Sequence, residues 1–78
     1  MHSLIHSFGL TVRQLREARG WSQERLAEHS DLNSSYVGEI ERGNVIASLK
    51  TVEKLARSME LAPSALLHNC EELHQQRN

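Results

Sequence analysis

This chain is poor in the residues on which disulfide scaffolds and membrane anchors depend. Its one cysteine, Cys70, has no second cysteine with which to form an internal disulfide, a pattern typical of the reducing cytoplasm. The first residues lack the basic start and apolar run of a secretory signal, and no apolar run approaches the ~20 residues that a membrane-spanning helix needs. We therefore expect a small cytoplasmic protein without a membrane partner.

Metal-site and catalytic patterns are missing as well. The five histidines are scattered, and although His2 and His6 have a spacing that one helix could use, nothing supplies a third ligand at a metal-type spacing. No acid–base pair or activated nucleophile stands out. The sequence therefore predicts no metal, no cofactor and no enzymatic activity.

The charge balance points in two directions. Nine basic and ten acidic residues give a formal net charge of -1, which argues mildly against a nucleic-acid-binding protein. The residues up to Arg57 hold eight bases and seven acids, whereas the tail from Ser58 holds one base and three acids. The tail thus makes the chain acidic, and DNA binding would depend on a local positive face.

The pattern of the chain indicates one all-α domain of five helices over residues 1–78. There is no strand alternation, repeat or linker. Apolar spacing and capping residues predict helices at about 8–19, 23–29, 34–42, 49–59 and 63–73, with the last residues frayed. The first helix has two alternative starts, one turn earlier with Leu4 or later at Thr11, which forms a capping-box pattern with Gln14.

The segment from Ser22 to Gly43 is the most informative part of the chain. It has the pattern of two short helices joined by a tight turn at Asp31, a residue that tolerates a left-handed backbone. Its predicted inner positions are Leu26, Ala27, Leu32, Val37 and Ile40. Its predicted outer positions are Asn33, Ser34, Ser35, Glu39 and Arg42. A helix with short polar side chains on its outer face suits the DNA major groove, although such a face can also be merely solvated.

These residues resemble the Cro/C1-type helix-turn-helix family of bacterial and phage repressors. The resemblance covers about residues 8–68 and rests on SQERLA, on Leu32, on Tyr36-Val37, on IERG at 40–43, and on the flanking VRQLREARGW and SLKTVEKLARSMELAPSALL. It implies a compact, lambda-repressor-like DNA-binding domain with its motif at about 23–42. The five-helix size is also similar to that of the controller proteins of restriction-modification operons.

The resemblance implies a set of DNA-contacting residues: Gln23, Asn33, Ser34, Ser35, Tyr36, Glu39, Arg42 and Arg16. Gln23 would bind a phosphate, or be only a good helix former. Tyr36 would donate to a phosphate, or be a half-buried core residue. In this family the third helix, at about 34–42, is the recognition helix. Arg16 would pair with Glu41, and that pair would set the angle of the recognition helix and aim the guanidinium partly at a phosphate.

The outer helix face allows further alternatives on physical grounds. Arg42 could read guanine or hold a phosphate, and Glu39 could accept from cytosine or pair with an arginine. Gly38 costs about 1 kcal/mol in a helix relative to alanine, which close approach of DNA or of another helix would offset. The loop NVIAS after Gly43 is apolar, so strong clamping of the DNA backbone is not expected from it.

The fifth helix, at about 63–74, carries the predicted dimer interface. Its apolar stripe of Leu66, Leu67, Cys70 and Leu73 is longer than one small core needs. The alternative is that Leu66 and Leu67 cover the core of the monomer, that Leu73 is exposed, and that Cys70 is a small buried hydrophobe.

The sequence thus predicts a homodimeric, sequence-specific transcriptional regulator that binds a palindromic DNA operator, with a restriction-modification operon as a candidate target and RNA polymerase as a candidate partner. Two alternatives stay open. One is the DNA-binding antitoxin of a toxin–antitoxin pair, for which the short tail leaves little room. The other is a helix-turn-helix protein-interaction module, which the mildly acidic charge keeps in view.

Overall fold

The computed structural model describes residues 3–77 and confirms the all-α architecture. It contains α1 (Leu4–Ala18), α2 (Gln23–Ser30), α3 (Ser34–Glu41), α4 (Leu49–Ser58) and α5 (Pro63–Arg77), with no strand among the described residues. The first helix takes the earliest of its predicted starts because Ser3 caps it, while the Thr11 hydroxyl donates to the Ser7 carbonyl inside the helix. The fifth helix continues to Arg77, beyond its predicted end near residue 73.

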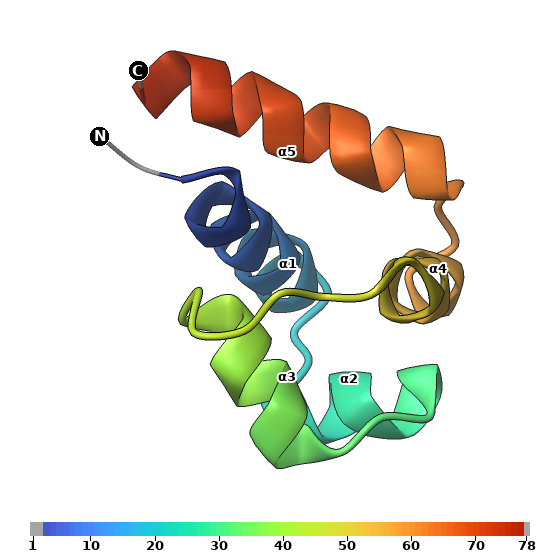
Figure 1. The fold of residues 1–78 in the computed structure, drawn as a ribbon. Helices are drawn as coiled ribbons and strands as arrows, with labels where there is room; N and C mark the ends of the chain where they lie inside the picture. Colours follow the sequence, from blue (N-terminus) through green and yellow to red (C-terminus); the bar gives the residue numbers. More distant parts are fainter. Residues whose placement is uncertain (1–2, 78) are drawn as a thin grey trace.

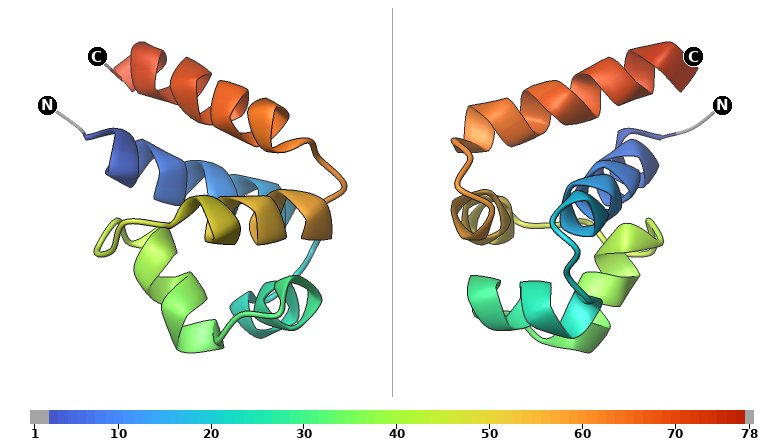
Figure 2. Two further views of the ribbon diagram at one scale, coloured as in Figure 1. Left: turned by 45° about the vertical axis from the view of Figure 1, so that its right-hand side comes forward. Right: turned by 180° about the vertical axis from the view of Figure 1, so that it is seen from behind.

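The helices α1 and α4 lie in the middle of the domain, with other helices on either side of them. Figure 1 and Figure 2 show α5 along one side of this central pair and the α2–α3 unit on the other. Accordingly, α1 packs against both α5 and α3, and α4 packs against both α5 and α2. None of the described helices is long and apolar enough to cross a membrane. The layout leaves the outer face of α3 open to solvent.

The core is continuous from α1 to α5. Its largest fully buried side chains are Leu26, Ile40, Leu55, Met59, Leu66, Val12 and Val37. The predicted inner positions of α2 and α3 are buried as expected, and Leu32 is packed against the core at its edge. Leu49 continues the apolar spacing of α4 (Val52, Leu55, Ala56), which predicts an inward side chain, but as the first residue of the helix it is 82% exposed.

One close helix crossing has no signature in the sequence. At Gly9, an added Cβ would lie 2.2 Å from the Ile40 carbonyl oxygen and 2.8 Å from that of Glu41. The backbones of α1 and α3 therefore meet at a position where only glycine fits. This crossing fixes how closely the end of α3 approaches α1.

The first four helices end in the same way. Each is followed by a residue with positive φ, and these are the four such residues of the described chain: Gly20, Asp31, Gly43 and Glu60. The next residue donates its amide back to a carbonyl five positions earlier, at 2.8–3.2 Å, and the positive-φ residue donates to the carbonyl three positions before it. This is the Schellman arrangement. Glycine and aspartate at three of these ends are residues that tolerate a left-handed backbone; Glu60 is a residue type that the sequence alone does not mark for this position.

Candidate nucleic-acid interface

The turn between α2 and α3 sets the angle between the two helices. Asp31 has φ 56° and ψ 47°, the left-handed conformation predicted for it. This conformation lets the Leu32 amide donate to the Ala27 carbonyl at 2.8 Å, and Leu32 then packs on the core. Ala27 is 3% exposed, as expected at a close crossing of helices. The turn thus presents α3 with its apolar side inward and its polar side outward.

A shallow hollow lies between the start of α2 and the outer face of α3. It is lined by Gln23, Glu24, Ser34, Ser35, Gly38, Glu39 and Arg42. Five of the predicted DNA-contacting residues therefore meet on one surface. Asn33 lies at its edge as the N-cap of α3, where its Oδ1 accepts from the Ser35 amide at 2.7 Å.

The hollow itself is not positive. Glu24 and Glu39 set two carboxylates against the single guanidinium of Arg42. Both α2 and α3 begin at this surface, with Gln23 and Ser34 as their first residues, so the positive dipole ends of two helices lie at it. Any attraction for phosphate would therefore come from these N-termini and from cations outside the hollow.

Arg16 and Glu41 form the predicted ion pair, and it is buried. Arg16 Nε donates to Glu41 Oε2 at 2.7 Å and its Nη2 donates to Oε1 at 3.0 Å, with side-chain exposures of 11% and 3%. The hydrogen bond to Glu41 raises the pKa of Arg16 against the opposing effect of burial. The pair ties α1 to the last turn of α3.

The structure corrects the second role expected of Arg16. Its remaining guanidinium nitrogen, Nη1, donates to the Trp21 carbonyl at 2.8 Å, so each of its three nitrogens has a partner within the protein. With only 11% of the side chain exposed, the guanidinium faces inward. Arg16 therefore positions α3 through Glu41, and its guanidinium is turned toward these protein partners rather than outward.

Gln23 has a role that sequence reasoning missed. Its Nε2 donates to Glu41 Oε1 at 3.0 Å, so the amide belongs to the same buried network as Arg16. The backbone amide of Gln23 is at the first helical position and makes no bond within α2. Phosphate binding by that amide stays a prediction, but the side chain joins α2 to α3.

Glu39, Arg42 and Asn44 form a polar cluster at the end of α3. Arg42 Nη2 lies 3.2 Å from Glu39 Oε1, and Asn44 Nδ2 donates to Glu39 Oε2 at 3.0 Å. The hydrogen bonds from Asn44 and Arg42 lower the pKa of Glu39, so the carboxylate stays charged at neutral pH. Of the two roles predicted for Glu39, the structure shows the arginine partner.

Tyr36 lies at the edge of the domain. Its ring packs against the core, and its hydroxyl is 3.2 Å from Thr51 Oγ1 on α4. The free protein therefore satisfies the hydroxyl internally. Contact between Tyr36 and a phosphate stays a prediction.

The predicted dimer residues divide into buried and accessible ones. Leu66 is 0% exposed and Cys70 is 1% exposed, and both belong to the buried core of the protomer. This corrects the assignment of Leu66 to a dimer interface, whereas Cys70 lines the apolar groove described below. Burial, followed by the charge of Glu71, raises the pKa of the Cys70 thiol, as expected of an unreactive cysteine. Leu67 is 43% exposed, whereas Leu73 is half-buried and lines a different hollow of α5.

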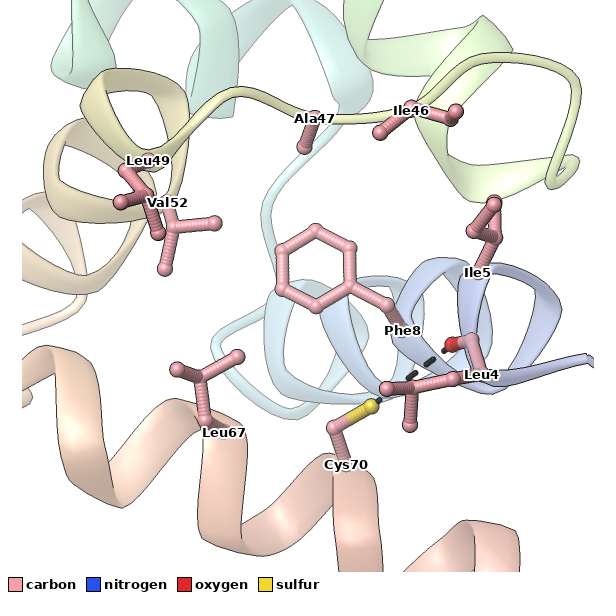
Figure 3. Close-up of a pocket in the computed structure, with 9 residues that line it drawn as sticks. All are labelled: Leu4, Ile5, Phe8, Ile46, Ala47, Leu49, Val52, Leu67 and Cys70. Atoms are coloured by element: carbon pink, nitrogen blue, oxygen red, sulfur yellow. Dashed lines mark hydrogen bonds between the residues drawn. The ribbon is translucent and has the colours of Figure 1, made fainter.

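The exposed apolar side chains gather at one place. All four large exposed hydrophobic residues of the described chain line a single groove: Leu4, Ile46, Leu49 and Leu67, with exposures of 55, 76, 82 and 43%. Figure 3 shows them around Phe8, with Ile5, Ala47, Val52 and Cys70 completing the lining. We call this surface the apolar groove. It joins the start of α1, the loop after α3, the start of α4 and the middle of α5.

Metal-ligating side chains do not gather in the described part of the chain. No group of three His, Cys, Asp or Glu residues there could hold a metal ion. His2, one of the pair considered from the sequence, lies outside the described residues.

Comparison with known proteins identifies the family to which the chain belongs. A family model described as a helix-turn-helix domain matches residues 7–68 of the chain. The chain belongs to the helix-turn-helix family. The matched residues span α2, the turn and α3 together with the helices that support them, in agreement with the Cro/C1-type resemblance. The protein is thus a helix-turn-helix transcriptional regulator of a DNA-binding family.

Among proteins of this family, the regulator is similar to several controller proteins. It is 39% identical over 71 residues to the control protein C.BamHI of Bacillus amyloliquefaciens, covering 83% of this chain and 88% of that one. Among solved structures, the restriction-modification controller protein C.AhdI from Aeromonas hydrophila has 45% identity and a TM-score of 0.77 over 80% of this chain and 94% of that one. The controller protein C.Esp1396I, at 22% identity, shares the fold with a TM-score of 0.83 over 94% of each chain.

Proposed function

We propose that this regulator binds a palindromic DNA operator as a homodimer in the cytoplasm, and that it controls a restriction-modification operon. The observation that carries the proposal is the hollow at α2 and α3, where five residues predicted to contact DNA meet on a surface supported by a buried ion pair. Similarity to two proteins named as controllers supports the choice of operon.

The hollow supports DNA binding by its shape and by its groups. Short side chains at Ser34 and Ser35 let the start of α3 approach base edges, and Arg42 supplies the one planar fork of donors at this surface. The open N-termini of α2 and α3 supply amides for phosphate oxygens. Positioned over a promoter, such a protein excludes RNA polymerase; positioned beside one, it contacts the polymerase.

A second copy of this chain is the occupant that best fits the apolar groove. The groove is lined by apolar side chains and Cys70, with no charged residue, so a charged partner surface would lose hydration without compensation. Soluble monomers seldom gather their exposed apolar residues in this way. A twofold axis would set one groove against the same groove of a partner, as in an isologous dimer. Two recognition helices could then reach successive major grooves, about 34–36 Å apart.

Leu49→Asp should therefore weaken dimerisation. Leu49 is 82% exposed, so the variant should fold, but an aspartate in the apolar groove would lose apolar contact and bury a charge. We expect the dimer dissociation constant to rise by about 10- to 100-fold, measured by sedimentation velocity. Asn69→Asp is the matched control, because it adds the same charge on an exposed position of α5 outside the groove. A Leu49→Asp protein that dimerises as well as Asn69→Asp would place the interface elsewhere.

A salt series distinguishes DNA binding from the alternative of a protein-interaction module. The wild-type protein would be titrated onto a fluorescent random-sequence duplex at salt concentrations from 50 to 200 mM. If a dimer contacts about six phosphates, the affinity should fall about a thousandfold over that range. Absence of binding at the lowest salt would favour the interaction module, and an affinity independent of salt would exclude phosphate contact.

A further inference from the structure

Gly38 lies in the middle of α3 at a position whose backbone does not require glycine. The glycines with positive φ are Gly20 and Gly43, so Gly38 has an ordinary helical conformation. At Gly9, glycine is needed because the carbonyl oxygen of another helix lies 2.2 Å from the place of a Cβ. No backbone atom of another helix is comparably close to Gly38. The cost of glycine inside a helix therefore calls for a different explanation here.

The space beside Gly38 is taken by the ends of two side chains from the hollow. An added Cβ would lie 3.2 Å from Nη1 and 3.4 Å from Nη2 of Arg42, and 3.3 Å from Oε1 of Gln23. Gly38 is nevertheless buried, because these polar groups cover it. The Arg42 guanidinium therefore lies back against the α3 backbone, one turn before its own residue.

Glu39 contacts the guanidinium in this place, and Asn44 in turn contacts Glu39. Glu39 Oε1 lies 3.2 Å from Arg42 Nη2, and Glu39 is itself held through Oε2 by Asn44 at 3.0 Å. The pairing occupies one guanidinium nitrogen and leaves other N–H donors of the planar fork free. Arg42 is thus paired with Glu39 and has the room that Gly38 provides.

The end of α3 differs from the ends of the other helices in a way that serves this cluster. After α1, α2 and α4, the residue that follows the positive-φ position is apolar and packs on the core: Trp21, Leu32 and Leu61. After α3 it is Asn44, whose side chain is exposed and donates to Glu39. The usual apolar contact of a Schellman motif is replaced by a polar contact that orients Glu39.

We propose that Gly38 and Glu39 are positioning residues for Arg42, and that Arg42 reads a guanine in the major groove. A planar fork held in one orientation matches the O6 and N7 acceptors of guanine and loses little freedom on binding. An added Cβ at position 38 would lie 3.2 Å and 3.4 Å from the two terminal nitrogens of the fork, so the guanidinium would have to shift by a few tenths of an ångström to admit it. The inference rests on the proposed function, since it assigns one base contact of the same surface.

The test uses the full chain and a duplex that the wild-type protein enriches from a randomised library. Gly38→Ala should raise the melting temperature, by up to about 4–8 °C if the whole gain in helix propensity is realised. It should nevertheless weaken binding to the enriched duplex about tenfold. Affinity for a random-sequence duplex should stay within about twofold, because phosphate contacts carry no sequence information.

Two companion variants identify the contact. Replacing one guanine of the enriched duplex by 7-deazaguanine removes N7 and should weaken the wild-type protein about tenfold while leaving Arg42→Ala, which has no donor for N7, unaffected. In the Arg42→Ala background, Gly38→Ala should cause no further loss. Glu39→Gln should weaken binding to the enriched duplex while strengthening binding to random DNA, since a charge that repels phosphate is removed. Glu28→Ala, on the exposed surface of α2, is the control and should match the wild type.

Three results would overturn the inference: wild-type affinity in Gly38→Ala, an equal loss caused by Gly38→Ala in the Arg42→Ala background, or a uniform loss on enriched and random duplexes in Arg42→Ala. The last would mean that Arg42 holds a phosphate. If Gly38→Ala does not fold, the deazaguanine series with Arg42→Ala decides alone, since Arg42 is 56% exposed. A wild-type protein that enriches no duplex would overturn the proposed function, and this inference with it, before any variant is compared.

Discussion

Glu41→Ala should lower the free energy of unfolding by about 3–5 kcal/mol, because it leaves the buried guanidinium of Arg16 without its charged partner. It also removes the acceptor of Gln23, so the side-chain hydrogen bonds that join the end of α3 to α1 and to α2 are lost together. For 78 residues, a typical total stability is only about 4–12 kcal/mol, so the expected loss is roughly a quarter or more of the total. Urea unfolding followed by helical circular dichroism measures the change.

Glu28→Ala provides the comparison for this result. Glu28 is an exposed glutamate on α2 with the same change of charge and helix propensity, and we expect its removal to change stability by no more than about 0.5 kcal/mol. If the two variants unfold at the same urea concentration, the buried pair does not hold the recognition helix in place.

Gly9→Ala should be almost as damaging, although it adds only one methyl group. The added carbon would lie 2.2 Å and 2.8 Å from two carbonyl oxygens of α3, and a backbone cannot turn aside as a flexible side chain can. The helices must therefore move apart, at a cost at or above the upper end of the ~1–3 kcal/mol typical of overpacking. Because α3 itself is displaced, DNA binding should fall even where the protein stays folded.

Gly20→Ala is the matched substitution for this second prediction. Gly20 has φ 70°, so alanine there is strained, but nothing lies within 4 Å of the added carbon. The expected cost is therefore only the ~1–2 kcal/mol of a left-handed backbone. A melting temperature of Gly9→Ala equal to or above that of Gly20→Ala would show that α1 and α3 do not meet as closely as described.

Helix positions were predictable because their signals are local. Ser22, Asn33 and Ser48 each cap a helix through a hydrogen bond between residues at most three apart, and apolar spacing marks the inward faces. The outer face of α3 followed from the same periodicity. The Arg16–Glu41 pair spans 25 residues, and it was foreseen only through resemblance to a family.

What the sequence did not predict depends on contacts between distant segments. The close crossing at Gly9 and the bond from Gln23 to Glu41 join different helices, and no local pattern marks either one. The apolar stripe of α5 did not show which of its members face the core: Leu66 does, whereas Leu67 faces the apolar groove. The groove itself is formed by side chains from four separate segments.

The most direct test of the account is the selection of DNA by the wild-type protein from a randomised duplex library at low salt. If the outer face of α3 reads bases and the chain pairs through its apolar groove, the enriched sequences should contain two inverted half-sites. Their centres should lie about one helical turn, ~10 base pairs, or a multiple of it, apart. Recovery of no common sequence would contradict the assignment of this surface to sequence-specific recognition.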